Sequence, residues 1–255
     1  MSDARRGTTR RTARRTLVAS TALLTVLGSG VPAVAATAPA LVQAPLVHHG
    51  GGVLRSTSGN WAGYAATGGM FTSVSASWVQ PSVSCAGTNT WSSFWVGLDG
   101  DGSNTVEQIG TEADCSGGSP VYSSWYEMYP QYPSNFGNTV RPGDHFTASV
   151  TTNGSGSFTL TLSDTTQGWS RTVNKSLRSA ALASAEVIAE APSSSSGVLP
   201  LSDFGSVSFT SATVNGRSLG SSNASSITMA SGGVTKATTS GLSGGTAFSV
   251  TWKHS

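Results

Sequence analysis

The chain has 255 residues, of which 10% are charged and 31 are glycine. This length suits one large domain or two small ones. No apolar run reaches about 18 residues, so a membrane-spanning helix is excluded.

The first 35 residues predict an export signal. Arginines at positions 5–15 precede an apolar stretch at 17–27, and Ala33-Val34-Ala35 has the small-x-small pattern of a cleavage site. A general secretory signal and a twin-arginine signal both fit. We expect a secreted protein, with residues 36–57 as a linker or short propeptide because they are rich in Ala, Pro and Gly.

Removal of residues 1–35 reverses the sign of the net charge. Six of the 14 basic residues and one of the 12 acidic residues leave with the signal, so 8 basic residues face 11 acidic ones. No basic patch remains to bind nucleic acid or an anionic membrane, and we expect neither as a partner. Because few carboxylate pairs exist to be lost at low pH, we also expect tolerance of acid.

Two cysteines, Cys85 and Cys115, are an even count in an exported chain and predict a disulfide. Closing a loop of about 30 residues would stabilise the fold by about 3–4 kcal/mol. Two cysteines and four scattered histidines do not suggest a metal site. Asp99-Gly100-Asp101-Gly102 is interpreted as a turn, since it lacks the closing Glu of a calcium loop. We expect no cofactor.

From Asn60 onward the sequence predicts short strands separated by Gly, Pro, Asn and Ser. Apolar residues alternate with Ser and Thr in several of them, as a half-buried strand requires. The predicted strands are 60–67, 74–78, 91–98, 105–110, 121–129, 146–150, 158–162, 169–173, 186–190, 207–209, 227–229 and 248–252, with one short helix at 176–183. About a dozen strands and almost no helix predict an antiparallel sandwich or barrel, with residues 58–255 as a single domain.

The segment 184–192 combines two carboxylates with an apolar run. On a strand, Glu186 and Glu190 share one face, while small apolar residues occupy the other. Burial raises the pKa of a carboxyl group on such a strand and suits it to general acid and base catalysis. An ion-pair partner or a charged edge-strand residue is the structural alternative. Glu107 and Glu127 are the other strand carboxylates, and Gln108 points to the face opposite Glu107.

Several catalytic classes fit these residues poorly. His145 is the only histidine inside the strand-rich region, and no Gly-x-Ser-x-Gly elbow is present, so a serine hydrolase is improbable. A β-glucanase using Glu186 and Glu190 is one alternative function, although Ile188 replaces the usual acidic residue between them. A non-catalytic carbohydrate-binding module is another, because many tryptophans could bind a sugar.

Five motifs occur together between about residues 56 and 215, and their order and spacing closely resemble the glutamic peptidases, or eqolisins. They are Ser58-Gly59-Asn60-Trp61-Ala62-Gly63-Tyr64, Trp95-Val96-Gly97-Leu98-Asp99-Gly100, Glu107-Gln108-Ile109-Gly110-Thr111, Trp125-Tyr126-Glu127-Met128-Tyr129-Pro130 and Ala185-Glu186-Val187-Ile188-Ala189-Glu190-Ala191-Pro192. The glutamic peptidases are fungal enzymes with bacterial relatives. After about residue 216 the sequence resembles the family only poorly. The fungal disulfide pattern is not reproduced.

The resemblance implies a concanavalin-A-like β-sandwich made of two antiparallel sheets. It also implies an acid endopeptidase that is insensitive to pepstatin, acts on polypeptides and works as a monomer. Gln108 and Glu190 match the catalytic glutamine and glutamate of the family. Trp95, Asp99 and Glu127 match positions near that pair, and Trp61 is a further candidate for substrate binding.

Overall fold

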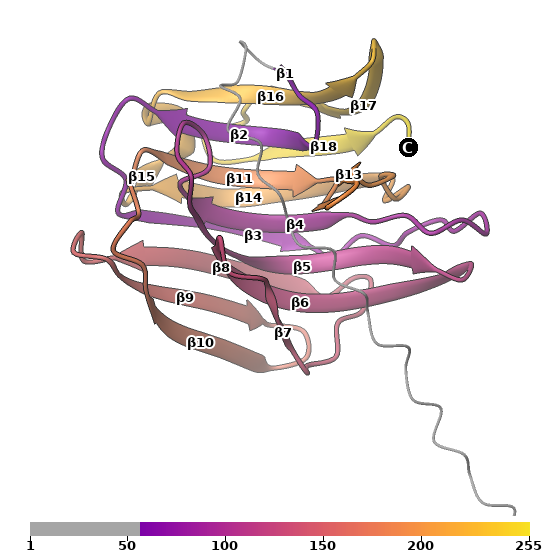
Figure 1. Ribbon diagram of the computed structural model, residues 1–255, viewed down its shortest axis with the longest axis horizontal. Coiled ribbons are helices and arrows are strands. Elements are labelled where there is room, and N and C mark those ends of the chain that lie inside the picture. Colours follow the sequence, from indigo (N-terminus) through magenta and orange to yellow (C-terminus); the bar gives the residue numbers. More distant parts are fainter. Residues whose placement is uncertain (1–56) are drawn as a thin grey trace, which may run out of the picture. The chain divides into compact units, whose positions relative to one another are not determined.

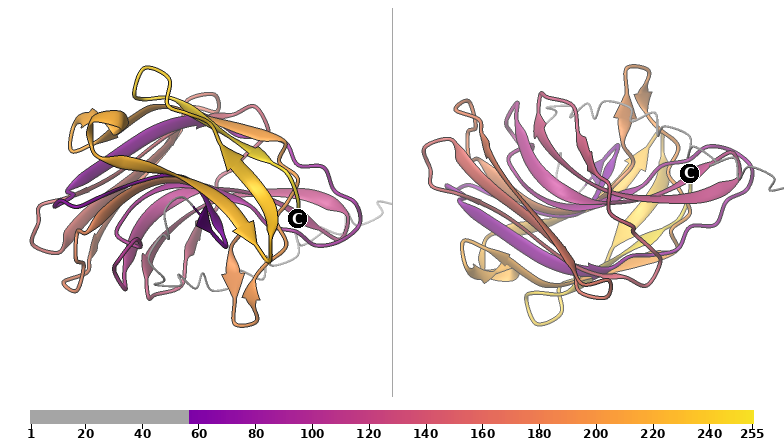
Figure 2. Two further views of the ribbon diagram at one scale, coloured as in Figure 1. Left: turned by 90° about the horizontal axis from the view of Figure 1, so that it is seen from above. Right: turned by 90° about the horizontal axis from the view of Figure 1, so that it is seen from below.

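Residues 57–255 are described by the computed structural model, and strands account for nearly all of their regular structure (Figure 1). Sixteen strands belong to one continuous ladder in which every pair is antiparallel except β1 with β16. The ladder bends over, so that two curved layers face each other (Figure 2). The predicted all-β sandwich is therefore confirmed.

Each layer has its own run of strands. The first contains, in spatial order, β10 (Trp169–Ser176), β9 (Ser157–Asp164), β8 (His145–Thr152), β3 (Ser73–Val79), β14 (Ser206–Val214) and β18 (Phe248–Trp252). The second contains β2 (Trp61–Thr67), β11 (Ser184–Glu190), β4 (Ser93–Leu98), β5 (Val106–Ser116), β6 (Ser119–Tyr129) and β7 (Ser134–Phe136). They are joined by β17 (Val234–Thr239) and β16 (Ala224–Ser231).

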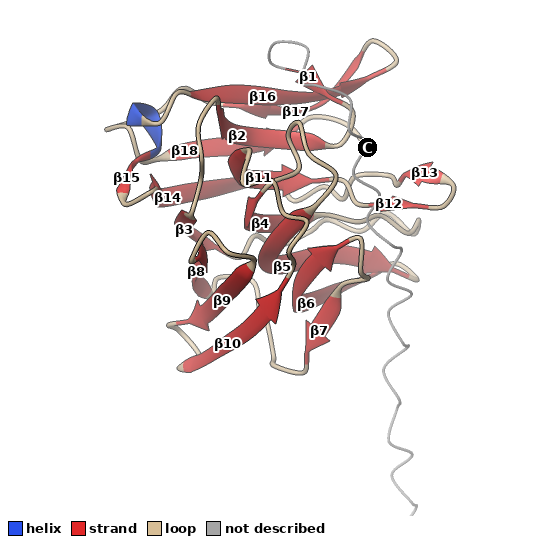
Figure 3. Cartoon of the chain, turned by 60° about the vertical axis from the view of Figure 1, so that its left-hand side comes forward, coloured by secondary structure: helices blue, strands red, loops and turns tan. Residues whose placement is uncertain are grey.

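The remaining elements are short. They are β1 (Thr57–Ser58), β15 (Arg217–Ser218), the hairpin of β12 (Ser193–Ser194) and β13 (Gly197–Val198), and the 3-10 turn η1 (Leu219–Ser221). Figure 3 shows η1 as the only helical piece in the described part of the chain. Across residues 57–255, no helix has the length and apolar character needed to cross a membrane. The expected signal (1–35) and all but the last residue of the expected linker lie outside the described residues.

The helix expected at 176–183 is not formed. Ser176 is the last residue of β10, and the residues after it form a loop in which Leu182 has a φ of 55°. Backbone N–H groups of Ala181, Leu182 and Ala183 donate to the carboxylate of Asp99 instead of to helical carbonyls. A side chain remote in sequence thus replaces the local hydrogen bonds that a helix would have needed.

The main hydrophobic core fills the space between the two layers. Alternation along β11 shows how the second layer contributes to it: Ala185, Val187 and Ala189 lie in this core, as the sequence predicted. A smaller cluster occupies the opposite face of the second layer, made of Trp61, Ala65, Trp95, Trp125, Ile188 and Ile227. We call that opposite face of β2, β11, β4, β5 and β6 the site face.

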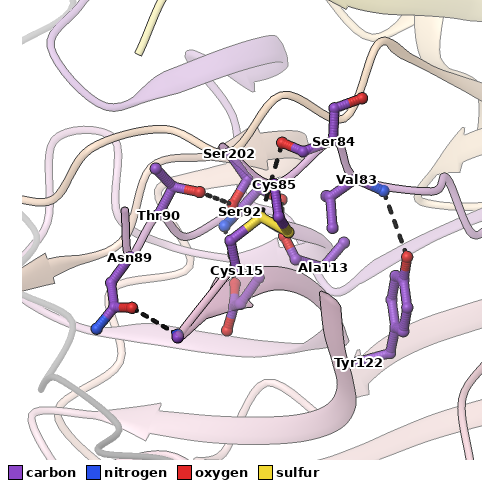
Figure 4. Close-up of a disulfide and its surroundings, with 12 residues drawn as sticks. Val83, Ser84, Cys85, Asn89, Thr90, Ser92, Ala113, Cys115, Tyr122 and Ser202 are labelled. Carbon is purple, nitrogen blue, oxygen red and sulfur yellow. Dashed lines mark hydrogen bonds between the residues drawn. A yellow bond between two sulfur atoms is a disulfide. The ribbon is translucent and has the colours of Figure 1, made fainter. Parts of the chain in front are cut away.

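The predicted disulfide is formed between Cys85 and Cys115 (Figure 4). It joins the segment after β3 to the end of β5, across a sequence separation of 30 residues. Nearby hydrogen bonds run from the backbone N–H of Val83 to the hydroxyl of Tyr122 and from that of Gly117 to Asn89. The cross-link therefore ties one layer to the other and stabilises the fold by about 3–4 kcal/mol.

Candidate active site

The register of four neighbouring strands places the candidate residues on the site face. Glu186 on β11 pairs with Gly97 on β4, which pairs with Gln108 on β5, which pairs with Glu127 on β6. Side chains of directly paired residues point to the same face. The structure thus puts both glutamates of β11 on the face that carries Gln108.

Glu190 is fully buried and is held through both carboxyl oxygens. Its Oε2 accepts a hydrogen bond of 2.8 Å from the indole Nε1 of Trp95, and its Oε1 accepts one of 3.0 Å from Nδ2 of Asn60. Trp61 is its cross-strand partner on β2 and packs edge-on against Trp95, with 5.2 Å between ring centroids. Two N–H donors to the carboxylate stabilise its ionised form.

Two glycines make room for the indole of Trp95 on the site face. A β-carbon at Gly97 would lie 2.9 Å from Cζ3 of Trp95 and 3.1 Å from Cβ of Gln108. One at Gly110 would lie 2.6 Å from Cβ of Trp95 and would also collide with the backbone oxygen of Phe94. The ring therefore lies against the sheet where these strands carry no side chain, with Gln108 beside one end.

Gln108 is also fully buried, and its amide Nε2 donates a hydrogen bond to Oε2 of Glu127 on the neighbouring strand. Burial raises the pKa of Glu127 to about 8, although the hydrogen bond from Gln108 opposes the shift. At acidic pH, Glu127 is therefore an uncharged partner that fixes how the Gln108 amide is turned.

Gln108 and Glu190 are related through Trp95 by two diagonal steps across the sheet. Trp95 lies two residues from the direct partner of Glu190, Ser93, and two residues from the direct partner of Gln108, Gly97. Diagonal neighbours on adjacent strands are about 7–8 Å apart, within reach of long side chains. The hydrogen bond between Trp95 and Glu190 shows that these two side chains meet across the first diagonal step.

Asp99 has a structural position at the end of β4. Besides the three backbone N–H groups at 181–183, its carboxylate accepts a bond of 3.4 Å from the Thr105 hydroxyl. With these donors, Asp99 anchors the loop that leads into β11. It supports the site through that strand.

Two further carboxyl groups near Asp99 are fully buried. They belong to Glu107, on the core side of β5, and to Glu186, on the site face. Burial, followed by the charge of Asp99, raises the pKa of Glu107 to about 9. Burial also raises the pKa of Glu186 well above its usual range. Both groups are uncharged acids under acidic conditions.

The sequence-predicted residues thus divide into three groups. Trp61, Trp95 and Glu190 form one contact network, Gln108 and Glu127 form an adjoining pair, and Asp99 lies just after the end of β4. Asn60, which also binds Glu190, was not singled out, although it lies inside the first motif. Only the pairing of β2 with β11 brings it there.

The described residues offer no obvious metal centre. Between Thr57 and Ser255, no group of three or more His, Cys, Asp or Glu side chains is arranged to hold an ion. The groups that the site face presents around Glu190 and Gln108 are a carboxylate, an amide and an indole N–H donor.

Comparison with known proteins identifies what this arrangement is similar to. Residues 59–252 match the model of the peptidase A4 family. Aspergillopepsin-2 of Aspergillus niger is 32% identical over 193 residues, covering 66% of this chain and 68% of that protein. The match reaches β18, so the expectation that the resemblance fades after about residue 216 is wrong. Strand β16, one of the two strands that join the layers, pairs with β2.

Solved structures of glutamic peptidases are similar to this chain in fold. Scytalido-glutamic peptidase with a transition state analog inhibitor superposes with a TM-score of 0.68 and is 29% identical, covering 77% of this chain and 99% of that one. SCP-B, described as a member of the eqolisin family in a complex with the tripeptide Ala-Ile-His, gives a TM-score of 0.64 at 27% identity, with the same coverage of both chains.

Proposed function

Because the chain belongs to the peptidase A4 family, the glutamic peptidases, and is a peptide-bond hydrolase, we propose that it is a secreted acid endopeptidase whose catalytic pair is Gln108 and Glu190. The observation that carries the assignment is the contact network around Trp95. Its indole donates to the carboxylate of Glu190, and Gln108 lies one diagonal step from Trp95 on the opposite neighbouring strand.

The first chemical step begins with Glu190 ionised. Its carboxylate takes a proton from a water molecule, and the oxygen of that water attacks the carbonyl carbon of the peptide bond. Asn60 and Trp95 hold the carboxylate in place, so it acts as a general base without reorganising.

Gln108 supplies the second element. Its amide nitrogen, which donates to Glu127 in the structure, donates in the reaction to the oxyanion that develops as the tetrahedral intermediate forms. Removing a donor of this kind typically costs about 3–4 kcal/mol of transition-state stabilisation. Protonated Glu190 then gives its proton to the leaving nitrogen as the carbon–nitrogen bond breaks, which returns the carboxylate to its starting state.

The relatives support a polypeptide substrate. One is described with a transition state analog inhibitor and another in a complex with a tripeptide. Extracellular location is proposed from the export signal at 1–35, and a monomeric state is proposed because the family resemblance implies it. Neither proposal depends on the assignment of the catalytic pair.

The test compares isosteric variants at two glutamates of one strand. Glu190→Gln is expected to lower kcat/KM on a denatured protein substrate at pH 3–5 by about a thousandfold or more, because the general base is lost. Glu186→Gln is the matched control: it lies four residues away on the same face, and its buried carboxyl is already uncharged at that pH. We expect it to keep activity within about threefold of wild type.

Gln108→Ala completes the set, and pepstatin and a chelator exclude contaminating proteases. Activity that resists both inhibitors and disappears in Glu190→Gln and Gln108→Ala, with circular dichroism unchanged, would establish the pair. A fully active Glu190→Gln enzyme would overturn it. Loss of activity in Glu186→Gln, with Glu190→Gln still active, would move the base to position 186.

A further inference from the structure

Strand β1 brings a hydroxyl group, that of Ser58, next to the residues that hold Glu190. β1 lies beside β16 (Figure 1), where Ser58 is the partner of Met229 in the one parallel pair of the described ladder. β16 also pairs with β2, the strand that begins directly after Asn60. Pairing with β16 therefore fixes the backbone of Ser58 beside the point where Asn60 reaches the catalytic carboxylate.

The hydroxyl of Ser58 has both of its acceptor positions filled by the backbone. The backbone N–H groups of Asn60 and Trp61 donate to its Oγ, at 3.4 and 3.2 Å. Its single hydrogen is donated to Oδ1 of the Asn60 side chain, at 3.2 Å. A hydroxyl has one donor and two acceptor sites, so this set uses all three. Asn60 must therefore present its carbonyl oxygen, and not its NH₂ group, to Ser58.

The orientation of the Asn60 amide decides which atom faces the catalytic carboxylate. With Oδ1 toward Ser58, Nδ2 lies toward Glu190 and donates to its Oε1 at 3.0 Å. Rotation of the amide by half a turn would put Oδ1 there instead. Two acceptor oxygens in contact need a proton between them, so the rotated amide would favour the protonated form of Glu190. Ser58 thus selects the orientation that suits an ionised base.

The same orientation matters in the second half of the reaction, when protonated Glu190 gives its proton to the leaving nitrogen. Trp95 and Asn60 both meet the carboxyl group with N–H donors, so neither accepts a hydrogen bond from it in this arrangement. The proton is therefore available to the substrate. A rotated Asn60 would accept that proton in a hydrogen bond at Oδ1 and hold it away from the leaving nitrogen.

We propose that Ser58 is a positioning residue for the reaction. By fixing the Asn60 amide, it keeps Glu190 a base while water attacks and a proton donor while the peptide bond breaks. Ser58 acts through Asn60 and not on the substrate. The inference rests on the proposed function, because it gives Ser58 a role only if Glu190 is the catalytic carboxyl group.

The other titratable groups on the site face cannot imitate this effect in acid. They are carboxyl groups, namely Glu186 on β11, Glu112 and Asp114 on β5 and Glu127 on β6. Burial raises the pKa of each of them, to about 7 for Glu112 and about 8 for Glu127. β2 contributes Trp61 and Ala65 to this face, and neither titrates. A change in the acidic limb of the pH–rate profile therefore reports on Glu190.

A double-mutant cycle tests whether Ser58 acts through Asn60. Ser58→Ala, Asn60→Ala and the combined variant are compared with wild type in kcat/KM on a peptide substrate between pH 2.5 and 6. Ser58→Ala should move the acidic limb to higher pH by about half a unit, with about a fivefold loss at pH 3 and less than about a twofold loss at pH 5. Asn60→Ala should move the limb by about one unit. Added to Asn60→Ala, the Ser58→Ala change should have no further effect.

Two variants of the same strand serve as controls. Ser58→Thr keeps a hydroxyl at this position and should restore the acidic limb of wild type. Thr57→Ala removes the neighbouring hydroxyl, whose residue is exposed, and should leave the whole profile unchanged. Thermal unfolding of every variant at pH 4 separates a loss of stability from a change in the limb.

The outcomes distinguish this role from the activity itself. A loss in Ser58→Ala that is equal at every pH, or that persists in full in the Asn60→Ala background, would show that the hydroxyl only supports the fold and would overturn the proposal. A Ser58→Ala profile identical to wild type would do the same. All three results leave the endopeptidase intact. If folded wild type cleaves no peptide, or if Glu190→Gln is fully active, the proposed function fails and the role of Ser58 fails with it.

Discussion

At the scale of single residues, the indole of Trp95 is the link between the two members of the proposed catalytic pair. Its Nε1 donates to Glu190, its six-membered ring lies beside Gly97, and Trp61 packs against it edge-on. The residue is fully buried, so its orientation is set by packing as well as by the hydrogen bond. The indole therefore acts both as a hydrogen-bond donor and through its packing, and a substitution that keeps the ring but removes the N–H separates these two contributions.

Trp95→Phe should remove the N–H and keep an aromatic ring in the same space. With one donor fewer, the carboxylate of Glu190 is easier to protonate, so the acidic limb of the kcat/KM profile should move to higher pH by about half to one unit, with about a tenfold loss at pH 3. The measurement is a pH–rate profile on a peptide substrate. A profile that keeps its acidic limb while losing rate uniformly would show that the indole acts only through packing.

At the scale of elements, strand β4 carries the site because it alternates a large residue with small ones on the site face. Ser93, Trp95 and Gly97 point there, while Phe94, Val96 and Leu98 enter the main core. A side chain at position 97 would occupy the space shared by the indole and Gln108. Glycine is therefore required at position 97 for Trp95 to lie between Glu190 and Gln108.

Gly97→Ala should misplace both Trp95 and Gln108. We expect a drop in kcat of about a hundredfold, as small misplacements in a catalytic site commonly cause, with a loss of stability of about 1–3 kcal/mol from overpacking. Gly241→Ala is the control, because a β-carbon there meets no atom within 4 Å. Steady-state kinetics and thermal unfolding measure the two effects. Wild-type kcat in Gly97→Ala would contradict the geometry described for the indole.

At the scale of the whole molecule, the distribution of acidic residues indicates adaptation to low pH. Nine of the eleven Asp and Glu residues in the described chain are buried. Burial raises the pKa of Glu107 to about 9, of Glu127 to about 8 and of Glu112 to about 7, and it raises that of Glu186 as well. A carboxyl whose pKa is raised by folding binds more protons in the native state than in the unfolded state at pH values above the unfolded pKa.

The stability that these four carboxyls contribute is therefore fully present below about pH 4 and should be lost as the pH rises toward 9. For Glu107 alone, the loss between its unfolded pKa and pH 7 is at most about 3.5 kcal/mol. Glu107→Gln should match wild type in Tm at pH 4 and exceed it at pH 7, as differential scanning calorimetry would show. A wild-type Tm that is higher at pH 7 than at pH 4, or an equal Tm for both proteins at pH 7, would refute this account.

The sequence by itself determined the class of fold, the disulfide and the faces of the strands. The alternation of apolar and polar residues along a strand depends only on neighbouring residues, so it can be recognised in the sequence. Strand β11 shows this directly: its acidic and apolar faces were assigned correctly because a strand turns each side chain to the face opposite its neighbour. The family resemblance added the pairing of positions 108 and 190, which no local pattern contains.

Tertiary structure alone decided which strands are neighbours, and with that the surroundings of each site residue. Asn60 binds Glu190 across 130 residues of sequence, and Asp99 replaces a predicted helix by binding backbone groups more than 80 residues away. Glu186, Gly97, Gln108 and Glu127 are paired in sequence across four different strands. Cross-strand pairing and burial are set by the whole ladder, so the acidity, partners and reach of these side chains could not be obtained from the order of residues.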